Sequence, residues 1–125
     1  MFVFLLLSCS AFKNKVIEKS YYDNGNIRYK IEKTNGKING FAIFWNQDGT
    51  LKNKVEYSND MINGEWIEYY SSGNIRSITN YIFGEKNGLE IFYYNNGIKK
   101  TEQSFKNNSP NSKIIRWKEN GDLIQ

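Results

Sequence analysis

Apolar and polar residues alternate along most of this chain, and the alternation itself repeats every 24 residues. Isoleucine stands at positions 43, 67, 91 and 115, and an aromatic residue follows each of them two places later. Residues two apart point to the same face of a β-strand, and β-branched and aromatic residues favour strands. Each period therefore predicts one strand with an apolar face. Its aromatic positions are Tyr21, Trp45, Tyr69, Tyr93 and Trp117.

A second strand in each period is predicted by another set of evenly spaced apolar residues. These are Ile27, Leu51, Ile75 and Leu123, then Ile31 and Val55, then Tyr57, Tyr81 and Phe105. All ten glycines fall on the same lattice, and most follow Asn or Asp, which is typical of tight hairpin turns. The pattern predicts an all-β fold: an antiparallel meander of about nine short strands. It is built from 24-residue two-stranded repeats in a single sheet that is either elongated or curled.

Two kinds of loop separate the predicted strands: a short one around Asp48-Gly49 and a longer one such as the segment 35–40. A two-residue short loop would pair Trp45 with Lys52. A three-residue loop, with Gly49 left-handed in a bulge, pairs Trp45 with Leu51 instead. Apolar pairing therefore favours the three-residue loop.

On this register the Ile, Trp and Tyr positions share one face, which we expect to be the buried one. A single sheet cannot cover that face alone, so it must curl, meet another layer, or pair with a second molecule, as in a homodimer.

The opposite face carries cations one period apart, interspersed with rings. Tyr, Trp and Arg dominate binding hot spots, so we expect this face to bind a partner. The alternative is a solvated face in which the cations pair with Glu32, Glu56 or Glu68. The cations, here called the cationic ladder, are Arg28, Lys52, Arg76 and Lys100, and the rings are Tyr22, Phe44, Trp66, Tyr70, Phe92 and Tyr94.

Residues 1–15 form an apolar N-terminal segment, distinct from the repeat domain at 16–125. Residues 6–9, which end in the only cysteine, Cys9, resemble the lipobox of a lipoprotein export signal. No basic residue precedes the apolar run and the run is short, which a start site further upstream would explain. The alternative is a hydrophobic start that tucks into the fold with Cys9 as a buried thiol. We expect a lipid on Cys9 to anchor the protein in the cell envelope; without a true signal it is cytoplasmic.

The composition bears on function chiefly because residue types common in catalytic and metal sites are scarce. The chain has no histidine, and its single thiol lies in the signal-like segment, so we expect no enzymatic activity, no cofactor and no metal. The net charge of +4 is mildly basic. It is compatible with an anionic membrane surface, but 17 basic residues mixed with 13 acidic ones argue against a nucleic-acid partner.

The repeats resemble the bacterial variant of the MORN repeat, in which a pair of tyrosines precedes the turn glycine. The clearest matches are the segments 21–28 and 69–76, followed by 63–70 and 93–97. The last period departs from the pattern, with Ser112 at a glycine position, Pro110 nearby and Lys99 at an apolar position. The resemblance implies an antiparallel β-meander. Many members of this family carry the label of antitoxins in toxin–antitoxin systems, and other MORN proteins resemble scaffolds for proteins or membrane lipids.

These observations predict a non-catalytic interaction module that binds a protein partner, presented as an envelope lipoprotein. The first alternative is a cytoplasmic antitoxin-like protein that covers its toxin with the sheet face. The second is a binder of membrane surfaces or glycans, which would use the same rings and cations.

Overall fold

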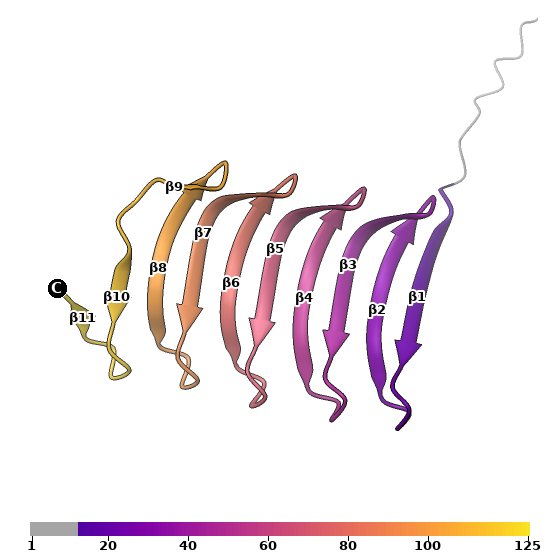
Figure 1. Cartoon of the computed structure of the whole chain (residues 1–125), viewed down its shortest axis with the longest axis horizontal. Coiled ribbons are helices and arrows are strands. Elements are labelled where there is room, and N and C mark those ends of the chain that lie inside the picture. The colour runs from indigo at the N-terminus through magenta and orange to yellow at the C-terminus, as the bar shows by residue number, and fades with distance from the viewer. Residues whose placement is uncertain (1–12) are drawn as a thin grey trace, which may run out of the picture.

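The computed structural model describes residues 13–125 as one open antiparallel sheet (Figure 1). The predicted lipidation site, Cys9, lies outside these residues. Neighbours in the sheet are neighbours in sequence, so the all-β meander is confirmed. The strands are β1 (Lys15–Tyr21), β2 (Ile27–Thr34), β3 (Lys37–Trp45), β4 (Leu51–Ser58), β5 (Met61–Tyr69), β6 (Ile75–Ile82), β7 (Glu85–Tyr93), β8 (Lys99–Lys106), β9 (Ser109–Pro110), β10 (Ile115–Trp117) and β11 (Leu123–Ile124).

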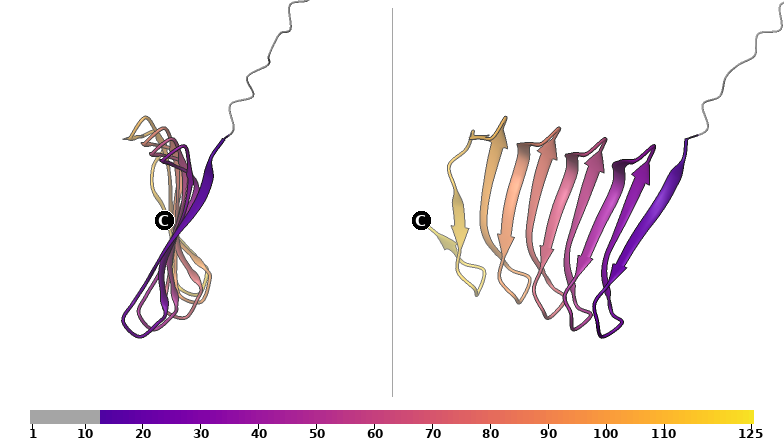
Figure 2. Two further views of the ribbon diagram at one scale, coloured as in Figure 1. Left: turned by 90° about the vertical axis from the view of Figure 1, so that its right-hand side faces the viewer. Right: turned by 45° about the vertical axis from the view of Figure 1, so that its right-hand side comes forward.

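The sheet has eleven strands where the sequence predicts about nine, because the last period breaks into short pieces. The two-residue β9 pairs only with β8, and the path then continues from β8 to β10 and β11. Figure 2 shows the whole array twisting along its length without closing on itself. The sheet is therefore elongated rather than curled into a barrel.

The short loops have the predicted three-residue form. Trp45 pairs with Leu51, Tyr69 with Ile75 and Tyr21 with Ile27, each beside a register shift. Gly49 takes φ 88°, and its N–H donates to the Asn46 carbonyl at 2.9 Å. A second bulge, three residues after the turn glycine, leaves one extra residue on the second strand of the first four short hairpins, and this residue belongs to the cationic ladder.

The longer loops differ from the prediction, because the chain turns within two residues and the rest of the segment is strand. Asn35 and Gly36 have φ of 51° and 80°, the pair of positive angles that a type I′ turn requires. Thr34 therefore pairs directly with Lys37, and Gly40 lies inside β3.

Glycines inside the strands make room for a side chain of the preceding strand. Gly64 has φ 130°, and a Cβ on it would lie 2.6 Å from Cδ and 3.0 Å from Cβ of Glu56. Glu32 covers Gly40 in the same way, and its Oε2 accepts the Phe41 N–H at 3.2 Å. Two of the three carboxylates that are candidates for pairing with the cationic ladder, Glu32 and Glu56, thus lie over strand glycines.

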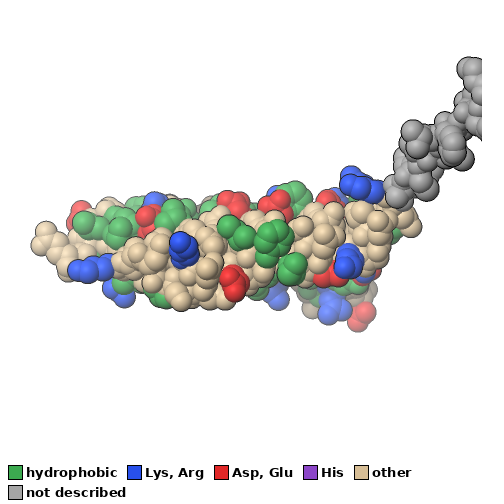
Figure 3. Space-filling view, turned by 90° about the horizontal axis from the view of Figure 1, so that it is seen from above, with side chains coloured by type: hydrophobic (Ala, Val, Ile, Leu, Met, Phe, Trp, Pro, Cys, Tyr) green, Lys and Arg blue, Asp and Glu red, His purple; other side chains and the backbone are tan. Residues whose placement is uncertain are grey.

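The two faces of the sheet can be read from the pairing. We call the side that bears Ile43, Ile67, Ile78 and Ile91 the isoleucine face, because these residues follow one another across the strands. The other side bears Phe44, Val55 and Trp66, and we call it the groove face. The described residues provide no second layer over either face, and seen from above the molecule is a thin slab with hydrophobic side chains at its surface (Figure 3).

The expectation that the isoleucine face is the buried one is wrong within this chain. The four residues classed as buried, Ala42, Val55, Ser77 and Thr79, all lie on the groove face. They are small or medium-sized, and larger side chains lie beside them on neighbouring strands: Trp66 is the strand partner of both Val55 and Thr79, and Phe92 is that of Ser77. The bulge explains the error: it inverts the alternation after Leu51, so Val55 lies on the face opposite to Leu51 although their spacing is even.

Candidate functional site

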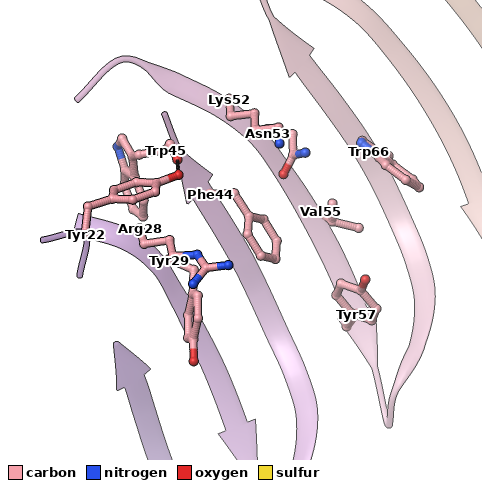
Figure 4. Close-up of a pocket in the computed structure, with 10 residues that line it drawn as sticks. All are labelled: Tyr22, Arg28, Tyr29, Phe44, Trp45, Lys52, Asn53, Val55, Tyr57 and Trp66. Atoms are coloured by element: carbon pink, nitrogen blue, oxygen red, sulfur yellow. Dashed lines mark hydrogen bonds between the residues drawn. The ribbon is translucent and has the colours of Figure 1, made fainter. Parts of the chain in front are cut away.

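A groove of about 570 Å³ lies on the groove face, over β2 to β5 (Figure 4). Rings form most of its wall, and two of them, Tyr29 and Phe44, lie 6.2 Å apart between centroids. The size is in the range of ligand-binding clefts. The lining residues are Tyr22, Arg28, Tyr29, Phe44, Trp45, Lys52, Asn53, Val55, Tyr57 and Trp66.

The hairpin bulges place two cations at this groove. Arg28 and Lys52 are the extra residues of the β1–β2 and β3–β4 hairpins, and both are exposed. Carbon Cζ of Arg28 lies 5.9 Å from the centre of the Tyr22 ring, within reach of a cation–π contact. The groove therefore combines an aromatic floor with a cationic rim.

The four cations of the ladder are not equivalent. Nη2 of Arg76 lies 3.0 Å from Oε1 of Glu68. The positions that correspond to Glu68 beside Arg28, Lys52 and Lys100 are Ser20, Phe44 and Phe92, so the carboxylate is absent there. Within residues 13–125 only Arg76 of the ladder makes an ion pair within 4 Å. The predicted pairing with glutamates thus holds for Glu68 alone.

Three tyrosines from the predicted binding face have a structural role. The hydroxyl of Tyr22 donates to the Trp45 carbonyl at 2.8 Å, that of Tyr70 to the Tyr93 carbonyl at 2.7 Å, and that of Tyr94 to the Trp117 carbonyl at 2.9 Å. Each bond reaches from one short turn to the next, so it ties successive periods together. Their rings remain beside the ladder, and Nζ of Lys100 lies 5.5 Å from the centre of the Tyr94 ring.

The C-terminal half of the groove face is more polar. Its smaller hollow, about 210 Å³, is lined by Glu68, Ser77, Thr79 and Glu90 among others. Glu90 forms an ion pair with Lys86, and Ser77 donates to Glu68 at 2.8 Å, so both carboxylates are engaged. Burial raises the pKa of the Tyr81 phenol here; Lys86 opposes that rise and the two carboxylates add to it.

The predicted binding residues therefore divide into two groups. Tyr22, Arg28, Phe44, Lys52 and Trp66 meet at the groove. The other five, Tyr70, Arg76, Phe92, Tyr94 and Lys100, lie from the end of β5 onward and do not line it.

Five further lining residues are not among the predicted ones: Tyr29, Trp45, Asn53, Val55 and Tyr57. Trp45 borders the groove where its carbonyl accepts the Tyr22 hydroxyl. The other four follow a bulge on their strand, where simple alternation assigns the wrong face. A count that reverses the face after each cationic-ladder residue would have found them.

Two polar atoms of the groove wall lack a hydrogen-bond partner within the described chain: Oδ1 of Asn53 and Nε1 of Trp66. Both are almost inaccessible to solvent. An unpaired buried polar group costs about 1–3 kcal/mol, so such groups call for an explanation. Asn53 pairs with Glu68 and Trp66 with Val55, so the two side chains are diagonal neighbours on β4 and β5. One acceptor and one donor match the two polar groups of an amide.

The lining residues contain no carboxylate, histidine or thiol. Over residues 13–125 there is also no cluster of three or more His, Cys, Asp or Glu that could hold a metal ion. No helix among the described residues is long and apolar enough to cross a membrane. What the groove can do chemically is hold an apolar group next to a negative charge.

Comparison with known proteins agrees with this repeat architecture. No curated protein and no solved structure matches the chain. Residues 16–32, 62–82 and 86–107 match the family model described as the MORN repeat variant, and the hairpins of this sheet are accordingly similar to that repeat.

Proposed function

We propose that this chain is a non-catalytic binding module, whose groove over β2–β5 holds a segment of a protein partner. The segment presents a bulky apolar side chain beside a carboxylate. The observation that carries the proposal is the groove itself: aromatic walls with Arg28 and Lys52 at the rim and no carboxylate in the lining.

Charge supports an acidic partner at this end of the sheet. Glu68 neutralises Arg76, whereas Arg28 and Lys52 have no ion pair within residues 13–125. An acidic side chain can meet either cation without breaking an ion pair of the described residues. The unpartnered Asn53 and Trp66 atoms favour a peptide, because a peptide bond offers one N–H and one C=O, which match this acceptor and this donor.

The test uses labelled peptides that carry Glu next to Phe, with matched peptides that carry Lys next to Phe, and fluorescence anisotropy. We expect the acidic peptides to bind and the basic ones not to. In the variant with Arg28→Ser and Lys52→Ser, affinity falls about 5- to 25-fold, since an exposed charge pair contributes up to about 1 kcal/mol.

The repeat supplies its own matched control. Lys100→Ser with Lys106→Ser removes two cations of β8 that lie away from the groove and have no ion pair within residues 13–125, and peptide affinity is expected to stay within about twofold. Equal loss in both double variants would show that net charge rather than the groove attracts the peptide. Binding to anionic phosphatidylglycerol vesicles with no peptide binding would replace the protein partner by a membrane surface.

Attachment to the envelope through a lipid on Cys9 is part of the proposal and rests on the lipobox-like residues 6–9. Metabolic labelling with a palmitate analogue tests it, because Cys9→Ser removes the thiol that the lipid would modify. Equal label in the parent and the variant would favour the cytoplasmic, antitoxin-like alternative, in which the same groove holds a toxin.

A further inference from the structure

The isoleucine face has no covering layer among the described residues, yet its side chains form an ordered row of five isoleucines and two charged residues. The row follows direct strand partners across the sheet, one residue per strand from β3 to β10. Its members are Ile43, Lys54, Ile67, Ile78, Ile91, Glu102 and Ile115.

We propose that two copies of this chain pack isoleucine face against isoleucine face, about a twofold axis that runs along β6 through Ile78. Rotation about such an axis keeps each row at its height and reverses the order of the strands. It therefore places β5 over β7, β4 over β8 and β3 over β10 of the second copy.

Under this rotation the row is complementary to itself. Ile78 meets its own copy, and Ile67 meets Ile91 of the second copy. One step further out, Lys54 meets Glu102 of the second copy. At the ends, Ile43 meets Ile115. An isologous interface requires this reciprocity: if residue i of one copy contacts residue j of the other, then residue j of the first copy contacts residue i of the other.

The neighbouring row on the same face, formed by the hairpin pairs, obeys the same symmetry. Ile75 of β6 meets its own copy, Tyr69 meets Tyr93, and Trp45 meets Trp117 of the second copy. Aromatic pairs attract one another beyond what their buried area alone gives. The polar member of this row is Lys99, which meets Leu51; its Nζ lies 2.5 Å from Oε2 of Glu102 in its own chain, so Glu102 meets Lys54 of the second copy while it also holds Lys99. A third row on the same face is mostly polar and forms the edge of the interface: Phe41, Glu56, Glu65, Asn80, Leu89 and Ser104.

The charges also select the direction of the axis. A twofold axis across the strands would place every strand over its own copy, so Lys54 would face Lys54 and Glu102 would face Glu102. Like charges in a face-to-face contact are unfavourable. Only the axis along the strands turns both residues into opposite-charge pairs.

The area is sufficient for a stable dimer. Five steps between the full-length strands β3 to β8, at about 4.8 Å each, and strands of about 26 Å give about 620 Å² per copy, to which the three-residue β10 adds a little. Stable interfaces bury from about 600 Å² per partner upward. The groove faces point outward in this arrangement, so the dimer goes beyond the proposed function: it presents two grooves and leaves each of them open.

The experiment is a charge swap in the full-length protein, followed by sedimentation velocity. Lys54→Glu brings two glutamates together at two places in the dimer, and Glu102→Lys brings two lysines together. Each single variant is expected to raise the dimer dissociation constant at least tenfold. The double variant exchanges the signs and is expected to recover most of the affinity.

Arg28→Glu is the control on the groove face: it weakens peptide binding and leaves the dimer unchanged, so the two proposals fail separately. Circular dichroism checks that each variant folds. A parent protein that stays monomeric at 100 μM, or a double variant no better than the single variants, would overturn the proposal.

Cross-linking tests the position of the axis. In a Cys9→Ser background, Ile78→Cys puts two thiols across the axis from each other, and a short bismaleimide is expected to join two chains. Lys52→Cys on the groove face is expected to give no cross-linked dimer. Efficient cross-linking through position 52 with none through position 78 would contradict this geometry.

Discussion

At the scale of single residues, Phe83 departs most from the repeat. It is 59% exposed and has φ 45°, at the turn position where the other periods have Asn35, Asn59 and Asn107. Left-handed backbone costs a residue with a Cβ about 1–2 kcal/mol, and Asn tolerates it better. Phe83→Asn is therefore expected to raise the free energy of unfolding by about 0.5–1 kcal/mol in urea titrations. Asn59→Phe is the reciprocal variant and should lower it; a drop in stability for Phe83→Asn would mean that the ring is held by contacts.

Glu18 is a second residue whose setting can be measured. A hydrogen bond from Lys33 at 2.6 Å, a second one from Tyr29 at 3.0 Å and the lysine charge lower the pKa of its carboxyl. A lowered pKa in the folded state adds stability above the unfolded pKa, and this stability is lost as the pH falls through the folded value. NMR titration of the Glu18 carboxyl should show the lowered pKa. Lys33→Met should move it back further than Tyr29→Phe does, and equal small shifts would contradict the order of the causes.

At the scale of the hairpin, the strand glycine is as necessary as the turn glycine. In Gly64→Ala the new methyl meets the Glu56 side chain and must also adopt φ 130°. Gly73→Ala must adopt φ 91° but has open space around it. We expect both variants to be destabilised, and Gly64→Ala to lose about 1–2 kcal/mol more because of the clash. Equal losses would show that Glu56 moves aside freely.

The sequence predicts the hairpins better than it predicts on which face of the sheet each side chain lies. The reason is that the loop length depends on nearby residues, whereas the face depends on every bulge along the strand. Pairing apolar Trp45 with Leu51 was enough to identify the loop length, because a mismatch with Lys52 was the only alternative. The face of Val55 could not follow from even spacing, since the bulge at Lys52 inverts the alternation. The cation rim of the groove was visible in the sequence as a period. The groove floor was not, because Tyr29 and Tyr57 come after bulges.

At the scale of the whole molecule, the sheet behaves as a one-dimensional array. Its main contacts join only neighbouring strands, and tyrosine hydroxyls such as that of Tyr70 tie each period to the next. Stability in such arrays is approximately a sum of unit and neighbour terms. A whole period should therefore be removable, whereas half a period would leave the faces out of register.

Deletion of residues 74–97 tests this array directly. It removes β6 and β7 and joins Gly73 to Ile98, the residue that follows the next turn glycine. The shortened chain is expected to fold with a lower melting temperature and to keep its affinity for the acidic peptide, because the groove over β2–β5 is untouched. The row on the isoleucine face becomes Ile43, Lys54, Ile67, Glu102 and Ile115, which is again self-complementary, now about Ile67. The variant should therefore still dimerise, more weakly because two strands of the interface are gone. In a Cys9→Ser background the cross-link should form through Ile67→Cys. A shortened chain that dimerises as tightly as the parent would place the interface elsewhere.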